Sequence, residues 1–215
     1  MNPANAHHAG HAPLSPLIHL IDDDAAVRDS LALLIGTVGL RVQVWSDPQA
    51  FIERFDRQGI GAIVLDVRMP GISGLTVLES LVAQGVDQPV IMLTGHGTVA
   101  MCRRAFKAGA AEFLEKPVND EQLLEALQNA VRLHVRSRER HQADRDARER
   151  YAQLSERERE VLGLIVAGLT NKEIGRALGL SPRTVETHRA NLFGKLEVDS
   201  LARLIRHYAA LTDGG

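Results

Sequence analysis

Between residues 17 and 115, five short runs of mostly apolar residues alternate with segments of helical period, and this alternation constrains the fold more than any other feature. Short apolar runs of this kind predict strands. Strands that alternate with helices form a parallel sheet with helices on both faces. We therefore expect an α/β domain with a doubly wound, five-stranded parallel sheet. The predicted strands are Leu17–Ile21, Val42–Trp45, Ala62–Leu65, Pro89–Leu93 and Glu112–Leu114, and the predicted helices between them are Ala25–Val38, Pro48–Arg57, Leu75–Gln84 and Val99–Ala108.

A change in composition indicates a second domain. A fifth helix is predicted to begin near Asp120, its apolar stripe ends at Val135, and a run of mixed charge then continues to Arg150. Such a run without Pro or Gly is typical of a solvated helical linker. From Leu154 onward the pattern is helical. We expect a disordered tail at 1–16, a first domain at 17–134, a charged helical linker at 135–153 and a small all-α domain of four helices at 154–215.

The composition excludes several classes of protein. No apolar run approaches the roughly 20 residues that a membrane-spanning helix needs, so we expect no membrane contact. The first sixteen residues lack the basic and apolar regions of a secretion signal, and we expect a cytoplasmic location. The single cysteine, Cys102, cannot form an internal disulfide and is expected to be a small buried thiol. The histidines His7, His8 and His11 are expected to bind metal only adventitiously.

Acidic side chains gather where predicted strands end. Asp22, Asp23 and Asp24 follow the first strand, and Asp66 follows the third. Carboxyl ends of parallel strands meet at one edge of the sheet, where α/β proteins bind ligands. Because the carboxylates repel one another, a hard divalent cation such as Mg²⁺ is the usual way to offset their charge. The sequence therefore predicts a magnesium site at this edge.

A hydroxyl and an ammonium are predicted to reach the same edge, since Thr94 ends the fourth strand and Lys116 follows the fifth. Such a set can hold a phosphoryl group on one aspartate, because the metal and the lysine neutralise its oxygens and the hydroxyl donates a hydrogen bond. For Asp24 taken alone, we favour the simpler role of a helix N-cap.

Four segments carry a family resemblance. The chain from about residue 17 to 133 resembles the receiver domains of two-component systems, which implies a flavodoxin-like fold. The resemblance implies that Asp66 accepts a phosphoryl group from a sensor histidine kinase and that Thr94 and Lys116 contact the phosphoryl oxygens. The Mg²⁺ ligands that it implies are Asp22, Asp23, Asp66 and the backbone carbonyl of Arg68. The matching segments are Ile-Asp-Asp-Asp at 21–24, Leu-Asp-Val-Arg-Met-Pro-Gly at 65–71, Leu-Thr-Gly-His-Gly at 93–97 and Phe-Leu-Glu-Lys-Pro at 113–117.

The same resemblance implies a switch formed by Thr94 and Phe113. A phosphoryl group adds a charge of roughly −1.5 to −2, which would pull Thr94 toward the third strand and let the ring of Phe113 turn inward. Taken alone, Phe113 is more simply explained as a core aromatic residue. Pro117 matches a position that often carries a cis peptide bond.

Capping and turn residues divide the second domain into four helices. Four short helices in about 60 residues suit a helix-turn-helix module, with a recognition helix at 181–196. The boundaries are set by a capping box of Ser155 and Glu158, by Asn171 at the start of the second helix, by Gly179 at the turn, by Ser181-Pro182 at the start of the third helix, and by a fourth helix from about Ser200 to Leu211.

The predicted recognition helix has a buried stripe of Val185, Leu192 and Leu196 and an exposed face of net positive charge. Since the whole chain has a formal net charge of −2, DNA binding must come from such a local surface. The predicted exposed residues are Arg183, Glu186, Thr187, Ala190, Asn191 and Lys195.

This half resembles the LuxR/NarL-type output domain, and the whole chain is similar to response regulators of the FixJ type. The segments are Leu-Ser-Glu-Arg-Glu-Arg-Glu-Val-Leu at 154–162, Gly-Leu-Thr-Asn-Lys-Glu-Ile at 168–174 and Leu-Ser-Pro-Arg-Thr-Val-Glu-Thr-His-Arg-Ala-Asn-Leu at 180–192. The resemblance implies that the recognition helix enters the major groove of promoter DNA. The residues expected nearest base edges are Glu186, Thr187, Ala190 and Asn191, and those expected to contact phosphates are Lys172, Arg183, Thr184 and Lys195.

Several of these side chains have simpler explanations. Glu186 is equally explained as a solvated acid, and we favour packing beneath the helix for His188. Arg176 and Arg189 are explained as surface charges or ion-pair partners.

The last helix carries more apolar surface than a small domain needs for its own core, although half of its stripe must serve that core. The family uses this helix for dimerisation. The expected dimer residues are Leu201, Leu204, Ile205 and Tyr208.

We therefore predict a DNA-binding transcriptional regulator that dimerises when Asp66 is phosphorylated, with a sensor histidine kinase, promoter DNA and RNA polymerase as partners. We expect no enzyme, because an aspartyl-phosphate phosphatase of the haloacid dehalogenase type needs a second acid two residues after its nucleophile, where Arg68 stands. The alternative is a regulator that works without phosphorylation, through a degenerate or ligand-responsive receiver. The complete set of acids, hydroxyl and lysine favours the first interpretation.

Overall fold

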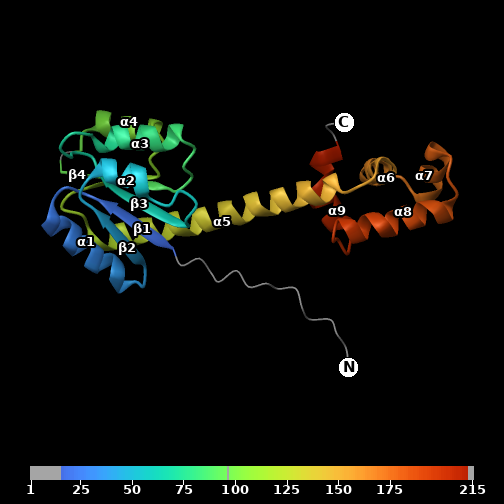
Figure 1. Ribbon diagram of the computed structural model, residues 1–215, viewed down its shortest axis with the longest axis horizontal. Coiled ribbons are helices and arrows are strands. Elements are labelled where there is room, and N and C mark those ends of the chain that lie inside the picture. Colours follow the sequence, from blue (N-terminus) through green and yellow to red (C-terminus); the bar gives the residue numbers. More distant parts are fainter. Residues whose placement is uncertain (1–15, 96, 213–215) are drawn as a thin grey trace, which may run out of the picture. The chain divides into compact units, whose positions relative to one another are not determined.

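The computed structural model describes residues 16–95 and 97–212, which form two compact units divided between Ser137 and Arg138 (Figure 1). Most of the expected tail lies outside the described residues, and so do His7, His8 and His11.

The first unit is a five-stranded parallel sheet, as predicted, and its strands lie in the order β2-β1-β3-β4-β5. Its core lies in two clusters, one formed with α2, α3 and α4 and the other with α1 and α5, so helices cover both faces. The elements are β1 (Leu17–Ile21), α1 (Ala25–Thr37), β2 (Arg41–Trp45), α2 (Pro48–Arg54), β3 (Gly61–Asp66), α3 (Gly74–Ala83), β4 (Val90–Thr94), α4 (Val99–Lys107), β5 (Glu112–Glu115) and α5 (Asp120–Ala152).

The helices that follow the first four strands begin at capping side chains, which accept hydrogen bonds from the otherwise unpaired N–H groups of the first turn. These caps are Asp24, Asp47, Ser73 and Thr98.

The predicted end of α2 was wrong by three residues. Helix α2 ends at Arg54 instead of Arg57, because Phe55 leaves the helix in an extended conformation and enters the core. Its ring stacks on Phe51 at a centroid distance of 4.4 Å.

Helix α5 continues through the run of mixed charge, as expected, but that run is not wholly solvated. Its first half buries Leu123 and Leu127 in the first unit, whereas Ala147 is buried in the core of the second. Tyr151 packs against the same second core. The prediction of a solvated linker was therefore wrong for the last turns of α5, because a small residue and an aromatic one, four positions apart, give them an apolar face.

The second unit is helical, with a single core shared by its helices. Ser155 and Glu158 form the predicted capping box of α6. Gly179 ends α7 with a left-handed φ of 67°, and Pro182 opens α8 as predicted. The helices are α6 (Glu156–Val166), α7 (Asn171–Leu178), α8 (Pro182–Lys195) and α9 (Leu201–Thr212). Across the described part of the chain, no helix combines the length and the apolar character needed to cross a membrane.

Candidate functional site

The strand register brings the predicted receiver residues to one edge of the sheet. Ile21 pairs with Leu65, so Asp22 follows β1 at the level where Asp66 ends β3. Thr94 pairs with Glu115 at the ends of β4 and β5, and Lys116 comes next. Asp22, Asp66 and Thr94 are all buried. Tertiary structure thus places two carboxyls, a hydroxyl and an ammonium together.

Lys116 links the two buried carboxylates directly. Its Nζ lies 2.6 Å from Asp22 Oδ2 and 2.6 Å from Asp66 Oδ1. The other oxygen of each carboxylate accepts a backbone hydrogen bond, from Asp24 N at 2.9 Å and from Arg68 N at 2.7 Å. These contacts fix both carboxylates in position.

Burial sets the electrostatics of this cluster. Desolvation raises the pKa of Asp66 above its ordinary value, and the charge of Asp22 adds to this effect, although hydrogen bonds from Lys116 and Arg68 oppose it. Burial alone would lower the pKa of Lys116, but its hydrogen bonds to Asp22 and Asp66 outweigh burial and raise it. When both carboxyls are ionised, the cluster carries one excess negative charge.

The two acidic residues that follow Asp22 lie in different environments. Asp24 is the N-cap of α1, where its Oδ1 accepts from Ala26 N and Val27 N, as we favoured. Asp23 is exposed at the rim. Among the described residues, no three His, Cys, Asp or Glu side chains are grouped closely enough to hold a metal ion. The two buried carboxylates and their excess negative charge nevertheless match the hard oxygen donors that Mg²⁺ prefers.

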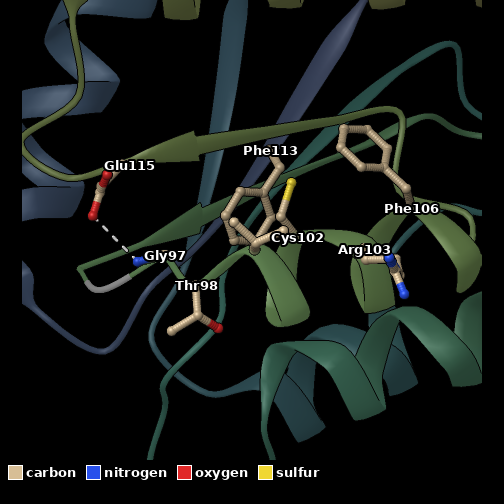
Figure 2. A pocket seen from close by; sticks show the side chains of 8 residues that line it. Gly97, Thr98, Cys102, Arg103, Phe106, Phe113 and Glu115 are labelled. Atoms are coloured by element: carbon tan, nitrogen blue, oxygen red, sulfur yellow. Dashed lines mark hydrogen bonds between the residues drawn. The ribbon is translucent and has the colours of Figure 1, made fainter.

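Thr94 and Phe113 are connected through a residue that the sequence analysis did not single out. A Cβ built on Gly97 would lie 3.3 Å from the Phe113 ring and 3.4 Å from Thr94 Cγ2. Gly97 N also donates to Glu115 Oε1 at 3.2 Å (Figure 2). The backbone of the β4–α4 loop therefore packs against both predicted switch residues.

Phe113 is half-buried, and it lines a pocket of about 470 Å³ at the α4–β5 face (Figure 2). Cys102, a free thiol, lines the same pocket and is half-buried instead of buried as expected, because this part of α4 lies at the pocket. The Lys116–Pro117 peptide bond is cis, as the family resemblance implied.

In the second unit, α8 has the predicted buried stripe of Val185, Leu192 and Leu196. Gly175 lets α7 approach the turn closely, since a Cβ there would lie 2.7 Å from the carbonyl oxygen of Leu180. Thr184 is half-buried, and its hydroxyl shares a hydrogen bond with that of Ser181. The other residues expected to meet DNA are exposed: Lys172, Arg183, Glu186, Thr187, Ala190, Asn191 and Lys195.

Other side chains of α8 have intramolecular contacts. The guanidinium of Arg189 lies over the ring of Phe193, at 5.9 Å from the centroid. His188 is half-buried. The ammonium of Lys195 contacts the buried carboxylate of Glu158 at 2.7 Å, a pairing that the sequence analysis missed because the two residues are far apart in the chain.

The apolar stripe of α9 is divided between two roles. Leu204 and Tyr208 are buried in the core of their own unit, so the expectation that they form a dimer interface was wrong for these two. Leu201 and Ile205 remain exposed, at 46% and 41%. Side chains three and four apart lie on the same side of a helix, but a stripe of four can still be split between the core and the surface.

Comparisons with known proteins agree with the division of the chain into two domains. Residues 18–128 match the family described as the response regulator receiver domain, and residues 152–208 match the bacterial regulatory proteins of the luxR family. The chain is 41% identical to the transcriptional regulatory protein FixJ of Bradyrhizobium diazoefficiens, over 88% of this chain and 92% of that protein. It is 45% identical to FixJ of Azorhizobium caulinodans, over 90% and 92%.

Solved structures show the same likeness. The structure of the response regulator StyR matches with a TM-score of 0.82 and 36% identity, over 91% of this chain and 99% of that one. Full-length FixJ from B. japonicum matches with a TM-score of 0.57 and 40% identity, over 90% and 96%.

Proposed function

This chain belongs to the response regulators that join a receiver domain to a LuxR-family DNA-binding domain, and we propose that phosphorylation of Asp66 controls its binding to promoter DNA. It is a FixJ-like transcriptional regulator, and its relatives are regulators and not enzymes. The observation that carries the proposal is the buried Asp66 carboxylate, held by Lys116 beside Asp22 at the sheet edge.

Asp66 acts as the nucleophile in this proposal. A carboxylate oxygen attacks the phosphorus of a phosphohistidine on the sensor kinase, the P–N bond breaks, and an acyl phosphate forms as the kinase histidine leaves. The ammonium of Lys116 is already 2.6 Å from Asp66 Oδ1, so it is placed to neutralise a phosphoryl oxygen.

Mg²⁺ would be held by Asp22, Asp23, Asp66 and the backbone carbonyl of Arg68. When bound, the ion would neutralise the negative charge that accumulates on the phosphoryl oxygens. Asp22 and Asp66 supply buried carboxylates, and exposed Asp23 follows Asp22 in the chain. The Arg68 amide donates to Asp66, which keeps that loop close to the site.

The switch residues would respond to the added charge. In our proposal the Thr94 hydroxyl moves to a phosphoryl oxygen, the adjoining backbone at Gly97 follows, and the ring of Phe113 turns inward. The close packing of Gly97 against both side chains supports this coupling. The pocket at the α4–β5 face would change shape, because Gly97 and Phe113 both line it.

The output domain would dimerise and bind a two-fold promoter site with α8 in the major groove. Leu201 and Ile205 would supply the apolar part of the dimer contact. The receiver would meet its kinase in the cytoplasm, and the DNA-bound dimer would contact RNA polymerase. In α8 and α7, Glu186, Thr187, Ala190 and Asn191 would lie nearest base edges, and Lys172, Arg183 and Thr184 would contact phosphates.

Intact-mass analysis after incubation with Mg²⁺ and acetyl phosphate tests the phosphorylation site. We expect one phosphoryl adduct on the wild type and on Asp29→Asn, a matched change at an exposed aspartate of α1, and none on Asp66→Asn. DNA binding measured in the same samples should rise only with the adduct. A wild type that stays unmodified but binds DNA would favour the alternative of a regulator that works without phosphorylation.

Size-exclusion chromatography with and without acetyl phosphate tests the dimer. We expect Leu201→Ser to weaken the phosphorylation-dependent dimer, and Leu33→Ser, at a leucine of α1 that is 76% exposed, to leave it intact. A monomer that gains DNA affinity without associating would refute dimerisation as the switch.

A further inference from the structure

A basic side chain at the end of the recognition helix forms an ion pair with a buried carboxylate of the same domain. Lys195 is the last residue of α8, and its Nζ lies 2.7 Å from Glu158 Oε2 on α6. The same ammonium donates to the backbone oxygen of Gln153 at 3.5 Å. The stem begins at the edge of the buried stripe, since Lys195 follows Leu192 by three residues and precedes Leu196 by one.

Glu158 needs this ammonium. Its side chain is only 5% exposed, and a buried carboxylate without a partner is costly. The Oε2 atom also accepts from Ser155 N at 2.7 Å, which completes the capping box of α6. Burial would raise the pKa of Glu158, but the hydrogen bonds from Lys195 and Ser155 outweigh it and lower the pKa. The carboxyl of Glu158 is therefore ionised at neutral pH.

A phosphate contact would compete with this pairing. A contact that drew the Lys195 ammonium away from Glu158 toward a DNA phosphate would leave a buried charge without its partner. Lys172, in contrast, is an exposed lysine of α7. It is not the partner of Glu158, so turning its side chain toward a phosphate leaves the ion pair of Glu158 with Lys195 intact. The two lysines are thus expected to act differently on DNA.

A second ion pair holds the same end of α8. Arg150, near the end of α5, lies 2.7 Å from Glu197 Oε2, just beyond the C-cap of α8. Glu197 adopts a left-handed φ of 51°, which non-glycine residues rarely do. The last turn of α8 is therefore linked to α6 by Lys195 and to α5 by Arg150.

We propose that Lys195 is a positioning residue: its ion pair with Glu158 sets the orientation of α8 for base recognition, and it makes no DNA phosphate contact. This refines the DNA-binding role on which it rests, and it withdraws Lys195 from the phosphate contacts expected from the sequence. A positioning residue should affect the discrimination between sequences. A phosphate contact should affect the salt dependence.

The test uses the full chain treated with acetyl phosphate and two duplexes of equal length. One duplex is selected from a random pool by the wild type, and the other is its scrambled counterpart. For Lys195→Met we expect the ratio of selected to scrambled affinity to fall about tenfold, comparable to the loss of one good base contact. Its salt slope on the scrambled duplex should match that of the wild type.

Lys172→Met is the matched control. It should flatten the salt slope by about 0.9 for each lost phosphate contact and leave the affinity ratio unchanged. Lys195→Arg should preserve the ratio, since a guanidinium can keep the contact with Glu158. Glu158→Gln should lower the ratio as Lys195→Met does, and the double variant should be no worse than Lys195→Met alone.

The opposite results would overturn the proposal. A salt slope that flattens in Lys195→Met as much as in Lys172→Met would make Lys195 a phosphate ligand. An unchanged affinity ratio in both Lys195→Met and Glu158→Gln would remove the positioning role. If Lys195→Met fails to fold, Lys195→Arg and Glu158→Gln decide the matter by the same two measurements. A wild type that enriches no duplex would instead refute sequence-specific DNA recognition itself.

Discussion

Replacing Lys116 with methionine would remove the ammonium that lies between two buried carboxylates. The side chains of Asp22 and Asp66 are 1% and 6% exposed, and each has an oxygen 2.6 Å from Lys116 Nζ. Methionine keeps much of the length of the stem but supplies no charge. The variant would therefore bury two negative charges side by side without this counter-charge.

The expected loss of stability is about 3 kcal/mol at pH 7. Removing one partner of a buried ion pair typically costs ~3–5 kcal/mol. We take the lower end because Lys116 is 22% exposed and because Asp66, whose pKa is already raised by burial, can take up a proton. With a urea slope of about 2 kcal/mol per M, the unfolding midpoint should fall by roughly 1.5 M.

The loss should depend on pH with a definite sign. In the variant the folded pKa of Asp66 rises further above its unfolded value, so the folded state binds the proton more tightly than the unfolded chain. The loss is therefore largest above the folded pKa, and it shrinks as the pH falls through it toward the unfolded value of about 3.9.

Urea unfolding followed by the fluorescence of Trp45 measures this loss in the receiver alone, because Trp45 is the only tryptophan of the chain. The measurement is made with EDTA present, and Lys107→Met, at an exposed lysine of α4, is the control. Added Mg²⁺ should restore part of the stability of Lys116→Met. A midpoint shift no larger than that of the control, or a loss that grows as the pH falls, would refute the reasoning.

Further predictions concern single buried or strained positions in each domain. Burial lowers the pKa of His19 to about 4 from its usual 6.5. The free energy of unfolding that neutral His19 contributes is therefore fully present above pH 6.5, and about 3 kcal/mol of it is lost as the pH falls to 4. His19→Val should remove that part of the pH dependence of urea unfolding. Tyr208→Phe should cost about 1–2 kcal/mol in thermal unfolding followed by circular dichroism, because the buried hydroxyl donates to a backbone carbonyl at 3.1 Å; a neutral result would mean that the carbonyl finds another donor. Gly179→Ala should cost about 1 kcal/mol by the same assay, because the φ of Gly179 is 67°, although an added Cβ would meet no neighbouring atom within 4 Å. Gly163→Ala within α6 should stabilise the domain by up to about 1 kcal/mol. Equal effects of the two changes would contradict the conformational argument.

The sequence was sufficient for the fold because its signals are local. Strand and helix periods, N-caps such as Asp24 and Ser155, and the turn at Gly179 each act over a few residues, and each agrees with the structure. The end of α2 was predicted wrongly for the opposite reason. Phe55 continues the apolar pattern of the helix, but packing on Phe51 takes it out of the helix and into the core.

The sequence predicted which residues belong to the candidate site more completely than it predicted the contacts between them. Residues at the ends of successive parallel strands must share one edge, so Asp22, Asp66 and Lys116 could be grouped before any distance was known. That one ammonium contacts both carboxylates follows only from the folded positions of β1, β3 and β5. The role of Gly97 was also out of reach, because a glycine has no side chain to reveal its contacts with Phe113.

The sequence by itself determined the two domains, the order of their elements and the acids, hydroxyl and lysine at the sheet edge. Tertiary structure alone decided which side chains on predicted surface positions form intramolecular ion pairs or are buried in the core. Lys195 is bound to Glu158, and Leu204 and Tyr208 belong to the core, although their periodic positions match those of Leu201 and Ile205. The physical reason is that a helical period shows which residues share a face, whereas burial and charge pairing depend on neighbours that are distant in the chain.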